Sequence, residues 1–585
     1  MLSFTDKPRP QLSPADQALY QSALAEQKRI QETWMMRRAQ LAIETDERHP
    51  DHKQVRAAVI KMCEADPIYF FNMFAWTTDP RLPDGEQDIP FILYEYQEEI
   101  IAWLIHHIKA TQNGLARRNL LAEKSRDMGL SWLVYDFMLW WWRFKGGRFM
   151  IAGMTEADVD VRGNMDTPFE KLRWSLTWWP AWLLPQGFKW NDHDKHMTLT
   201  NPKGGHIVGK AGIKNVGRGG RALMVVFDEF PHMENDEQAW KSAAGSTNCR
   251  FAIGTPNGPS GKFFRMAKGI PNSPDELPEE VEKLTIHWSV HPLKSVGLTY
   301  DDKGKPTSPW YRLQVMTLDK ETVAAEIDID YNASVKGIVY HDYKDMHRYG
   351  KRVGKPNLVP DPSRPMLWIF DPGLTFAALL VQKDKYGRYL CFREIIEYEA
   401  LVRDVGERVI EVSEAFEKLH GKKFDYEFCG DPAGSTRSGA GADQAEYEVF
   451  RDEFDFDVET SFLSEMSTKL RIINRIEATH GRMSRMVMSL QEPTPSFLVD
   501  VDYCVTLDDA YSGKYRYKVN KDTKEVDRTK VEHKQPWCDI ADCAGYGVLY
   551  YFGISGEKKK RQTDPNATDH QGVTWDQGGT RRRYA

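Results

Sequence analysis

Leu223-Met224-Val225-Val226-Phe227 is followed directly by Asp228-Glu229, so that an unbroken apolar run ends in two adjacent acids. Such a run is typical of a strand that is buried on both faces of a parallel sheet. Phosphoryl transfer uses a carboxylate pair of this kind, because one acid holds Mg²⁺ while the next orients or deprotonates the attacking water. The stretch therefore predicts a nucleotide-hydrolysing site in which Asp228 holds the metal ion and Glu229 is catalytic. The alternative is a strand that ends in two solvated acids.

A candidate phosphate-binding loop precedes this strand in the chain. It is Lys124-Ser125-Arg126-Asp127-Met128-Gly129-Leu130-Ser131, and it lies between a short apolar strand and an apolar helix. That is the position of a phosphate loop in nucleotide-binding folds. Gly129 and Ser131 are in register with the Walker A pattern GxxxxGK[ST], whereas Leu130 stands where the lysine is usual. Because the phosphates need a nearby positive charge, Lys124 and Arg126 are the candidates for that role.

Three further segments are candidates for the same site. The amide of Gln97, at the start of a predicted helix, can both donate to and accept from adenine, which makes Gln97 a candidate base reader. Thr255 lies in the turn GTPNG after the third apolar strand, where it could sense the γ-phosphate. Arg218 and Arg221 lie in a glycine-rich loop just before the acidic strand. Either could act as an arginine finger, or contact the phosphate backbone of DNA.

A second set of acids lies in the C-terminal half of the chain. Asp371 and Asp431 each end an apolar, strand-like stretch, and Asp539 and Asp542 are spaced to share one face of a predicted helix. Two strand ends and one helix can bring such acids to a pair of divalent ions, which clamp the attacking and leaving oxygens during phosphodiester hydrolysis. We predict Asp371, Asp431 and Asp539 as catalytic metal ligands, with Asp542 as a fourth ligand or a support for the others. Any one of these acids alone would be interpreted as a solvated turn residue.

The length of 585 residues is too great for one hydrophobic core. Short strand-like runs alternate with helix-like stretches in two blocks, which predicts an α/β fold with a parallel sheet in the first block. With its phosphate loop and strand-end acids, the first block resembles a P-loop (ASCE-type) parallel-sheet ATPase domain. The second block opens with a strand, a turn and a strand around Asp371, and it is similar to ribonuclease-H-like nucleases. We expect five parts: a charged helical N-terminal arm (1–60), the P-loop ATPase motor domain (61–271), a connector (272–340), the ribonuclease-H-like nuclease domain (341–553) and a disordered basic tail (554–585).

The composition indicates the cellular compartment and the kinds of partner to expect. Seven cysteines without a CxxC pair favour a reducing cytoplasm. The most apolar run, 130–142, is too short to cross a membrane and contains Asp136, so we expect a buried helix and no membrane partner. The net charge of −7 argues against a surface that is basic throughout, so that a basic path for DNA must be local.

The order of these motifs resembles that in the large terminase subunits of tailed bacteriophages. Gln97, the loop 124–131, the Asp228-Glu229 pair and GTPNG are similar to the ATPase half of that family, and the later acids to its nuclease half. The family includes phosphate loops whose basic residue stands at the start, so the resemblance assigns Lys124 to the phosphates. Its last nuclease motif often runs Asp-Asp-x-x-Asp. Cys538 replaces the first acid here, which makes Asp539 the natural ligand.

The resemblance implies an ATP-driven motor that moves double-stranded viral DNA through the portal into the procapsid, joined to an endonuclease that cuts concatemeric DNA when packaging starts and ends. Its cofactors would be ATP and Mg²⁺, with Mn²⁺ able to support cleavage. Its partners would be DNA, the portal protein, the small terminase subunit and further copies in a ring of five. We expect it in the host bacterial cytoplasm and transiently at the procapsid portal vertex, but not in the mature virion.

Two other functions are compatible with parts of the pattern. A helicase-like DNA repair or restriction enzyme would also combine a motor with a nuclease, but it would need a second motor domain that the sequence does not contain. A binding protein that docks on a capsid vertex would need neither set of acids for chemistry. Assays for ATP hydrolysis and DNA cleavage distinguish these functions.

Overall fold

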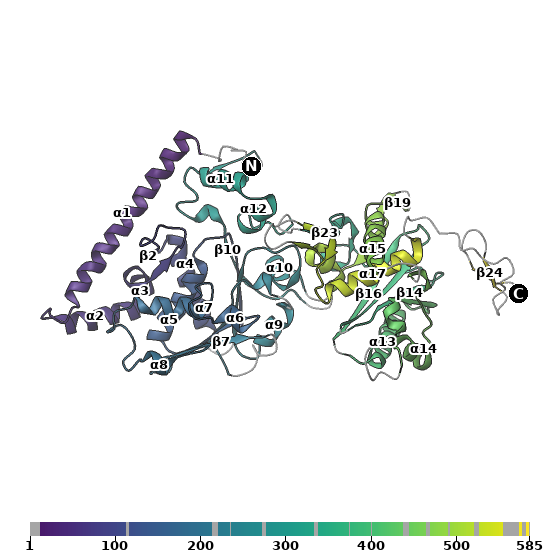
Figure 1. Cartoon of the computed structure of the whole chain (residues 1–585), viewed down its shortest axis with the longest axis horizontal. Coiled ribbons are helices and arrows are strands. Elements are labelled where there is room, and N and C mark those ends of the chain that lie inside the picture. The colour runs from purple at the N-terminus through teal and green to yellow at the C-terminus, as the bar shows by residue number, and fades with distance from the viewer. Residues whose placement is uncertain are drawn as a thin grey trace, which may run out of the picture. The chain divides into compact units, whose positions relative to one another are not determined.

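The computed structural model of the chain divides into two compact units (Figure 1). The first unit comprises residues 1–338 and 512–528, and the second comprises 339–511 and 529–585. The structure describes residues 12–583 except for a set of short segments, namely 113–115, 213–219, 234–235, 272–276, 303, 333–336, 374, 399, 437–443, 464–467, 490–491, 520–525, 554–572 and 576–580.

Three helices precede the first sheet. Helix α1 (Pro14–Glu44) begins at Ser13, whose side chain accepts a hydrogen bond from the Asp16 backbone, and it buries only Leu41. This agrees with the sparse apolar residues of the predicted arm, and Figure 1 shows α1 as a long helix along the edge of its unit. Helices α2 (His52–Ala65) and α3 (Pro67–Phe74) follow, and α3 is buried along most of its length because its sequence is almost wholly apolar.

The first unit is built on an eight-stranded sheet with the order β10-β3-β9-β8-β4-β7-β6-β5. The first six strands in this order are parallel, β6 is antiparallel to β7, and β5 is antiparallel to β6. Their bounds are β3 (Arg118–Lys124), β4 (Arg148–Gly153), β5 (Asp194–Lys195), β6 (Thr198–Thr200), β7 (His206–Ala211), β8 (Met224–Phe227), β9 (Cys249–Gly254) and β10 (Glu282–Ile286). Strand β9 lies between the phosphate-loop strand β3 and the acidic strand β8, which is the arrangement of an ASCE-type sheet. The predicted fold class of this half is confirmed.

The helices of this unit pack around that sheet. Helix α5 (Leu130–Phe144) is buried almost throughout, as expected for the apolar run that contains Asp136. No described helix is long and apolar enough to span a membrane. The other helices are α4 (Glu95–Gln112), α6 (Glu156–Val159), α7 (Pro168–Thr177), α8 (Trp190–His193), α9 (Asp236–Ala243), α10 (Gly261–Lys268), α11 (Pro309–Thr317) and α12 (Lys320–Glu326).

The stretch predicted as a connector, 272–340, contributes to the first unit. Its residues 282–286 form strand β10, which pairs in parallel with β3 at the edge of the sheet. Farther along, Trp288 is fully buried and packs with Tyr311, Val323 and Ile327 in a small apolar cluster. The segment therefore supports the strand that leads into the phosphate loop.

The second unit contains a seven-stranded sheet with the order β13-β21-β16-β15-β14-β17-β18. Strands β14 (Met366–Asp371), β15 (Thr375–Lys383) and β16 (Tyr389–Tyr398) form an antiparallel meander, and β17 (Tyr426–Gly430) and β18 (Val458–Glu459) continue parallel to β14. This is the ribonuclease-H-like strand order, so the predicted fold class is confirmed here too. The short strands β13 (Arg348–Tyr349) and β21 (Phe497–Asp500) extend the other edge.

Helix α17 (Trp537–Phe552) is the central helix of the second unit and packs against both the sheet and helix α15 (Thr468–Met483). Gly545 permits the close packing of the two helices, because a Cβ there would lie 2.0 Å from Arg475 Cγ. The remaining helices are α13 (Val402–His420), α14 (Glu446–Phe454) and α16 (Val505–Asp509).

Short strands complete the chain. They are β1 (Trp76–Thr78), β2 (Asp88–Pro90), β11 (Thr299–Tyr300), β12 (Pro306–Thr307), β19 (Met486–Ser489), β20 (Glu492–Pro495), β22 (Tyr517–Val519), β23 (Val526–Val531), β24 (Val573–Trp575) and β25 (Arg581–Arg583). Strands β24 and β25 pair within the stretch 554–585, which the sequence predicts to be a disordered tail. Most of that stretch lies outside the described residues.

Candidate functional site

The segment 124–131 connects the end of β3 to the start of α5, as the sequence predicts. Asp127 and Gly129 both have positive φ, 57° and 71°. A Cβ at Gly129 would also lie 2.8 Å from the side-chain nitrogen of Gln97, so glycine suits this position on two grounds. The backbone N–H groups in the first turn of α5 lack partners within the helix, and a helix N-terminus is a favourable place for a phosphate.

Residues from the predicted connector hold this loop in place. Ser125 Oγ donates to the Ile327 carbonyl at 2.6 Å and accepts from the Trp288 backbone N–H at 2.9 Å. The Arg126 guanidinium binds the Glu326 carboxylate at 2.6 Å. Lys294, also buried, donates to the Arg126 carbonyl at 2.5 Å, and burial lowers the pKa of Lys294 to about 8. Ser125 and Arg126 are thus engaged in bracing the loop, and sequence reasoning did not identify Lys294 or Glu326.

Lys124, at the start of the loop, reaches the acid that follows strand β8, across the intervening strand β9. Its Nζ lies 3.3 Å from Glu229 Oε1, and Lys124 itself is only 8% exposed. Glu229 has φ 51°, a left-handed backbone that is uncommon for a residue with a side chain and is often found at functional sites. Burial raises the pKa of Glu229, with the opposing charge of Lys124 partly offsetting it. The sequence-predicted Lys124 and Glu229 are therefore brought together.

Asp228 lies beside the other end of the loop. Ser131 Oγ donates to Asp228 Oδ1 at 3.2 Å, and Tyr135 Oη donates to Asp228 Oδ2 at 2.6 Å. A loop hydroxyl and a strand-end carboxylate are the pair that holds Mg²⁺ in P-loop enzymes, so the donor set suits that ion. Burial and the Asp228 charge raise the pKa of Tyr135 well above its usual value, which keeps the phenol a hydrogen-bond donor. Tyr135 lies one helical turn after Ser131, a spacing that could have identified it.

The other predicted nucleotide-site residues are arranged around this centre. Gln97 is buried, donates to the Met128 carbonyl at 3.3 Å and accepts from the Tyr94 N–H at 3.0 Å, so its amide touches the loop directly. Its role as a base reader stays a prediction. Thr255 follows β9 and is buried. Arg221 is exposed, and Arg218 lies outside the described residues.

The second predicted site lies in the other unit. Asp371 ends β14, and Asp431 follows the adjacent parallel strand β17, with Phe370 and Gly430 paired in register just before them. Asp431 Oδ1 accepts from the Ala433 N–H at 2.8 Å, and the Tyr546 hydroxyl of α17 donates to its other carboxylate oxygen. Tyr546 follows Asp539 and Asp542 on one face of the same helix, a spacing from which it could have been predicted.

The predicted acids in this unit influence each other electrostatically. Burial raises the pKa of Asp371 well above its ordinary value, and the charges of Asp542, Asp431 and Asp539 raise it further. Burial likewise raises the pKa of Asp539 to about 6. Asp539 Oδ2 is also a buried oxygen without a hydrogen-bond partner in the structure. Clustered carboxylates of this kind are suitable ligands for Mg²⁺ or Mn²⁺, which would relieve their mutual repulsion.

Asp542 differs from the other acids because it forms a buried ion pair. Arg475 Nη2, from α15, lies 2.7 Å from Asp542 Oδ1, and the Arg475 side chain is only 3% exposed. The guanidinium also lies 4.6 Å from the centre of the Tyr546 ring. This contact favours support over direct metal binding for Asp542, a choice that the sequence left open. Nothing in the spacing of the motifs indicates Arg475, because α15 is distant from α17 in the chain.

No protein-family model and no curated protein match the sequence. Solved structures with a similar arrangement include the large terminase of the thermophilic bacteriophage D6E in complex with ADP, at 16% identity over 78% of this chain and 98% of that chain, with a TM-score of 0.28. The HK97 bacteriophage large terminase is 10% identical over 83% of this chain and 99% of that chain, with a TM-score of 0.36. The Thermus phage P74-26 large terminase ATPase domain is 17% identical over 39% of this chain and 93% of that chain, with a TM-score of 0.24.

Proposed function

We propose that the chain is the large terminase subunit of a tailed bacteriophage, in which the first unit is an ATP-driven DNA motor and the second is a metal-dependent endonuclease. One observation carries this proposal. In an ASCE-type sheet, Lys124 at the end of β3 and Ser131 in the first turn of α5 meet Asp228 and Glu229, which follow β8, with contacts of 3.3 Å and 3.2 Å between the loop and the acids. Phosphoryl transfer from a nucleotide needs this set of groups.

Each group at the motor site has a distinct task. Ser131 and Asp228 would hold Mg²⁺, which when bound neutralises phosphate charge. Lys124 supplies a compact positive charge to the β and γ phosphates, in place of the missing lysine at position 130. Glu229 orients the attacking water and accepts its proton, for which a raised pKa is suitable.

The turn after β9 could report the state of the nucleotide. Thr255 is buried beside the acidic strand, and Asn257 Nδ2 donates to the Pro231 carbonyl at 3.0 Å, just beyond Glu229. A change at the γ-phosphate would therefore reach this turn through adjacent, hydrogen-bonded backbone. Arg218 or Arg221, in the loop before β8, would supply positive charge to the transition state of a neighbouring subunit in a ring.

In the second unit, Asp371, Asp431 and Asp539 would hold a pair of Mg²⁺ or Mn²⁺ ions, which polarise the scissile phosphate and activate water. Tyr546 positions Asp431 through a hydrogen bond, while Arg475 fixes Asp542. Cleavage of concatemeric DNA would occur here at the start and end of packaging. The proposed partners of the chain are double-stranded DNA, the portal protein and the small terminase subunit. Five copies of the chain would form a ring at the procapsid vertex.

The proposal is tested with the purified full-length chain. We expect it to hydrolyse ATP with Mg²⁺ and to cut plasmid DNA with Mn²⁺ whether or not ATP is present. It should also drive DNA into purified procapsids that carry a portal, in an assay for nuclease-protected DNA. A folded chain with neither activity would overturn the proposal in favour of a binding protein. Unwinding of a forked duplex without DNA uptake would instead favour the helicase-like alternative.

A further inference from the structure

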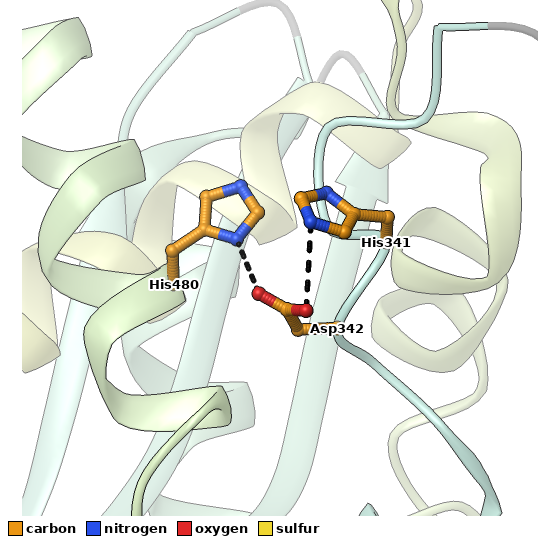
Figure 2. Close-up of side chains that lie close together, drawn as sticks. All are labelled: His341, Asp342 and His480. Atoms are coloured by element: carbon orange, nitrogen blue, oxygen red, sulfur yellow. Dashed lines mark hydrogen bonds and ion pairs between the residues drawn. The ribbon is translucent and has the colours of Figure 1, made fainter.

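A group of three potential metal ligands lies in the second unit, apart from the residues proposed for cleavage. His341 and Asp342 come from the loop that follows the start of this unit, and His480 comes from the last turn of α15 (Figure 2). One ligand atom from each residue lies within 4.8 Å of the other two. Among the described residues, this is the only group of histidine, cysteine and acidic side chains that meets that criterion.

The carboxylate of Asp342 lies between the two imidazoles. Asp342 Oδ1 is 3.5 Å from His341 Nε2, and Asp342 Oδ2 is 3.2 Å from His480 Nδ1. Figure 2 shows both rings directed toward this carboxylate from opposite sides. A tetrahedral zinc ion needs ligand atoms about 3.4 Å apart, given metal–ligand distances of about 2.0–2.1 Å. The three groups are therefore close to a binding geometry, and His341, whose side chain is 72% exposed, is free to turn inward.

Neighbouring groups hold two of the three ligands in orientation. Ser484 Oγ donates to Asp342 Oδ2 at 2.9 Å, which is the kind of outer contact that fixes a ligating carboxylate. The buried Tyr340 ring lies 5.2 Å from the His480 ring and packs against it. Because Tyr340 directly precedes the other two ligands, this packing also fixes the backbone that carries them.

We propose that His341, Asp342 and His480 bind a divalent transition-metal ion of the zinc class, with water as the fourth ligand. Two imidazoles and one carboxylate favour such an ion over Mg²⁺, which prefers oxygen ligands. The ion would connect the first residues of the second unit to the last turn of α15. The same helix carries Arg475, which binds Asp542, so the metal would stabilise the helix that supports the acidic centre.

The binding experiment uses the metal-stripped full-length chain and Zn²⁺ alone, in competition with a chromophoric chelator. We expect one Zn²⁺ whose affinity falls at least about tenfold in His480→Gln and in His341→Asn, in line with the loss of a ligand. The matched control is His420→Gln, which changes a histidine of the same unit that packs on Phe416 and lies at the end of α13. His341 is exposed, so its substitution tests the site even if His480→Gln impairs folding.

Two further measurements separate this site from the acidic centre. Asp371→Asn should retain the Zn²⁺ affinity, and Co²⁺ should give visible absorption bands of a nitrogen-ligated site in the wild type but not in His341→Asn. Saturating Zn²⁺ should raise the melting temperature of the wild type by several degrees and leave that of His480→Gln unchanged. Absence of Zn²⁺ binding to the wild type would overturn the proposal. So would affinity that survives both histidine substitutions, or that is lost in Asp371→Asn alone.

Discussion

Lys124 Nζ and Glu229 Oε1 lie 3.3 Å apart, so the only lysine of the phosphate loop is paired with the acid proposed to orient water. Nucleotide phosphates would compete with Glu229 for this lysine. Binding of ATP would thus release the carboxylate for its role at the same moment as it engages the loop. In the proposed mechanism, the pair would link nucleotide binding to the activation of Glu229.

Replacing Lys124 should be more damaging than replacing Arg126. Lys124→Ala should weaken ATP binding and abolish hydrolysis, because no other side chain of the loop brings a charge next to Glu229. Arg126→Ala should retain part of the activity, since the Arg126 guanidinium is engaged with Glu326. Nucleotide titration and phosphate-release assays measure the two effects. Wild-type hydrolysis by Lys124→Ala would move the role to Arg126.

Glu229→Gln should lower ATP hydrolysis by about 10²-fold or more while leaving Mn²⁺-dependent plasmid cleavage intact. The amide has the size of the carboxylate but accepts no proton, and the second unit is unchanged. Both rates should be measured on one preparation, together with ATP affinity. A parallel loss of cleavage would contradict the assignment of two separate sites.

Asp371→Asn, Asp431→Asn and Asp539→Asn should each abolish plasmid cleavage and spare ATP hydrolysis, because a missing ligand displaces the metal pair. Asp542→Asn should have a smaller effect. An exposed acid of the same unit, Asp345, provides the control substitution. If cleavage survived Asp539→Asn but not Asp542→Asn, the metal ligand of the last motif would be Asp542, one helical turn after Asp539.

The Arg475–Asp542 pair offers a test of what Asp542 does. Arg475→Met removes the guanidinium from its ion pair with Asp542 and should destabilise the second unit by about 3–5 kcal/mol. The double variant Arg475→Met/Asp542→Asn should regain much of that stability, as measured by chemical denaturation. If Asp542 only supports the site, cleavage should return with stability. A stable but inactive double variant would show that one of the two groups acts directly in cleavage.

Asp136 should make the stability of the first unit depend on pH. Burial raises the pKa of Asp136 to about 7 from an ordinary 3.8, so the folded protein holds this proton more tightly than the unfolded chain. The resulting destabilisation is absent below the ordinary pKa, grows as pH rises and is complete above about pH 7. Asp136→Asn should therefore increase the free energy of unfolding by a few kcal/mol at pH 8, and by less at pH 5.

Denaturation curves at the two pH values, followed by tryptophan fluorescence, measure that difference. The control is Asp192→Asn, which removes an acid from an exposed position of the same unit. If Asp136→Asn increased the free energy of unfolding equally at both pH values, or not at all at pH 8, the pH dependence would not come from Asp136.

Local sequence was sufficient to predict the position of those candidate site residues that lie at strand ends. Asp228, Asp371 and Asp431 each follow an apolar run, and parallel strands bring such ends to one edge of a sheet. Asp539 could be predicted because a helix keeps a fixed spacing. The fold class of both units follows from this alternation of strands and helices together with the resemblance of the motifs, whereas the order of the strands in each sheet comes from the structure.

Contacts between distant segments could not be predicted in this way. Arg475 and Lys294 are buried and contact residues that are far away in the chain, Asp542 and Arg126. No local sequence pattern indicates either contact. The stretch 272–340 has the Pro, Gly and charge content of a connector, yet strand β10 within it pairs with β3. Five residues of alternating exposure give too weak a signal to distinguish an edge strand from a linker.

The two hydrogen bonds of Ser125 have a mechanical consequence. Its hydroxyl is held by the Trp288 N–H on one side and by the Ile327 carbonyl on the other, at 2.9 Å and 2.6 Å. The phosphate loop cannot move without pulling on both segments or breaking these bonds. Residue 327 lies near the point at which the chain leaves the first unit, at 338. Ser125 therefore ties the phosphate loop to the last part of this segment, so that a small displacement of the loop would be transmitted to residues 288 and 327.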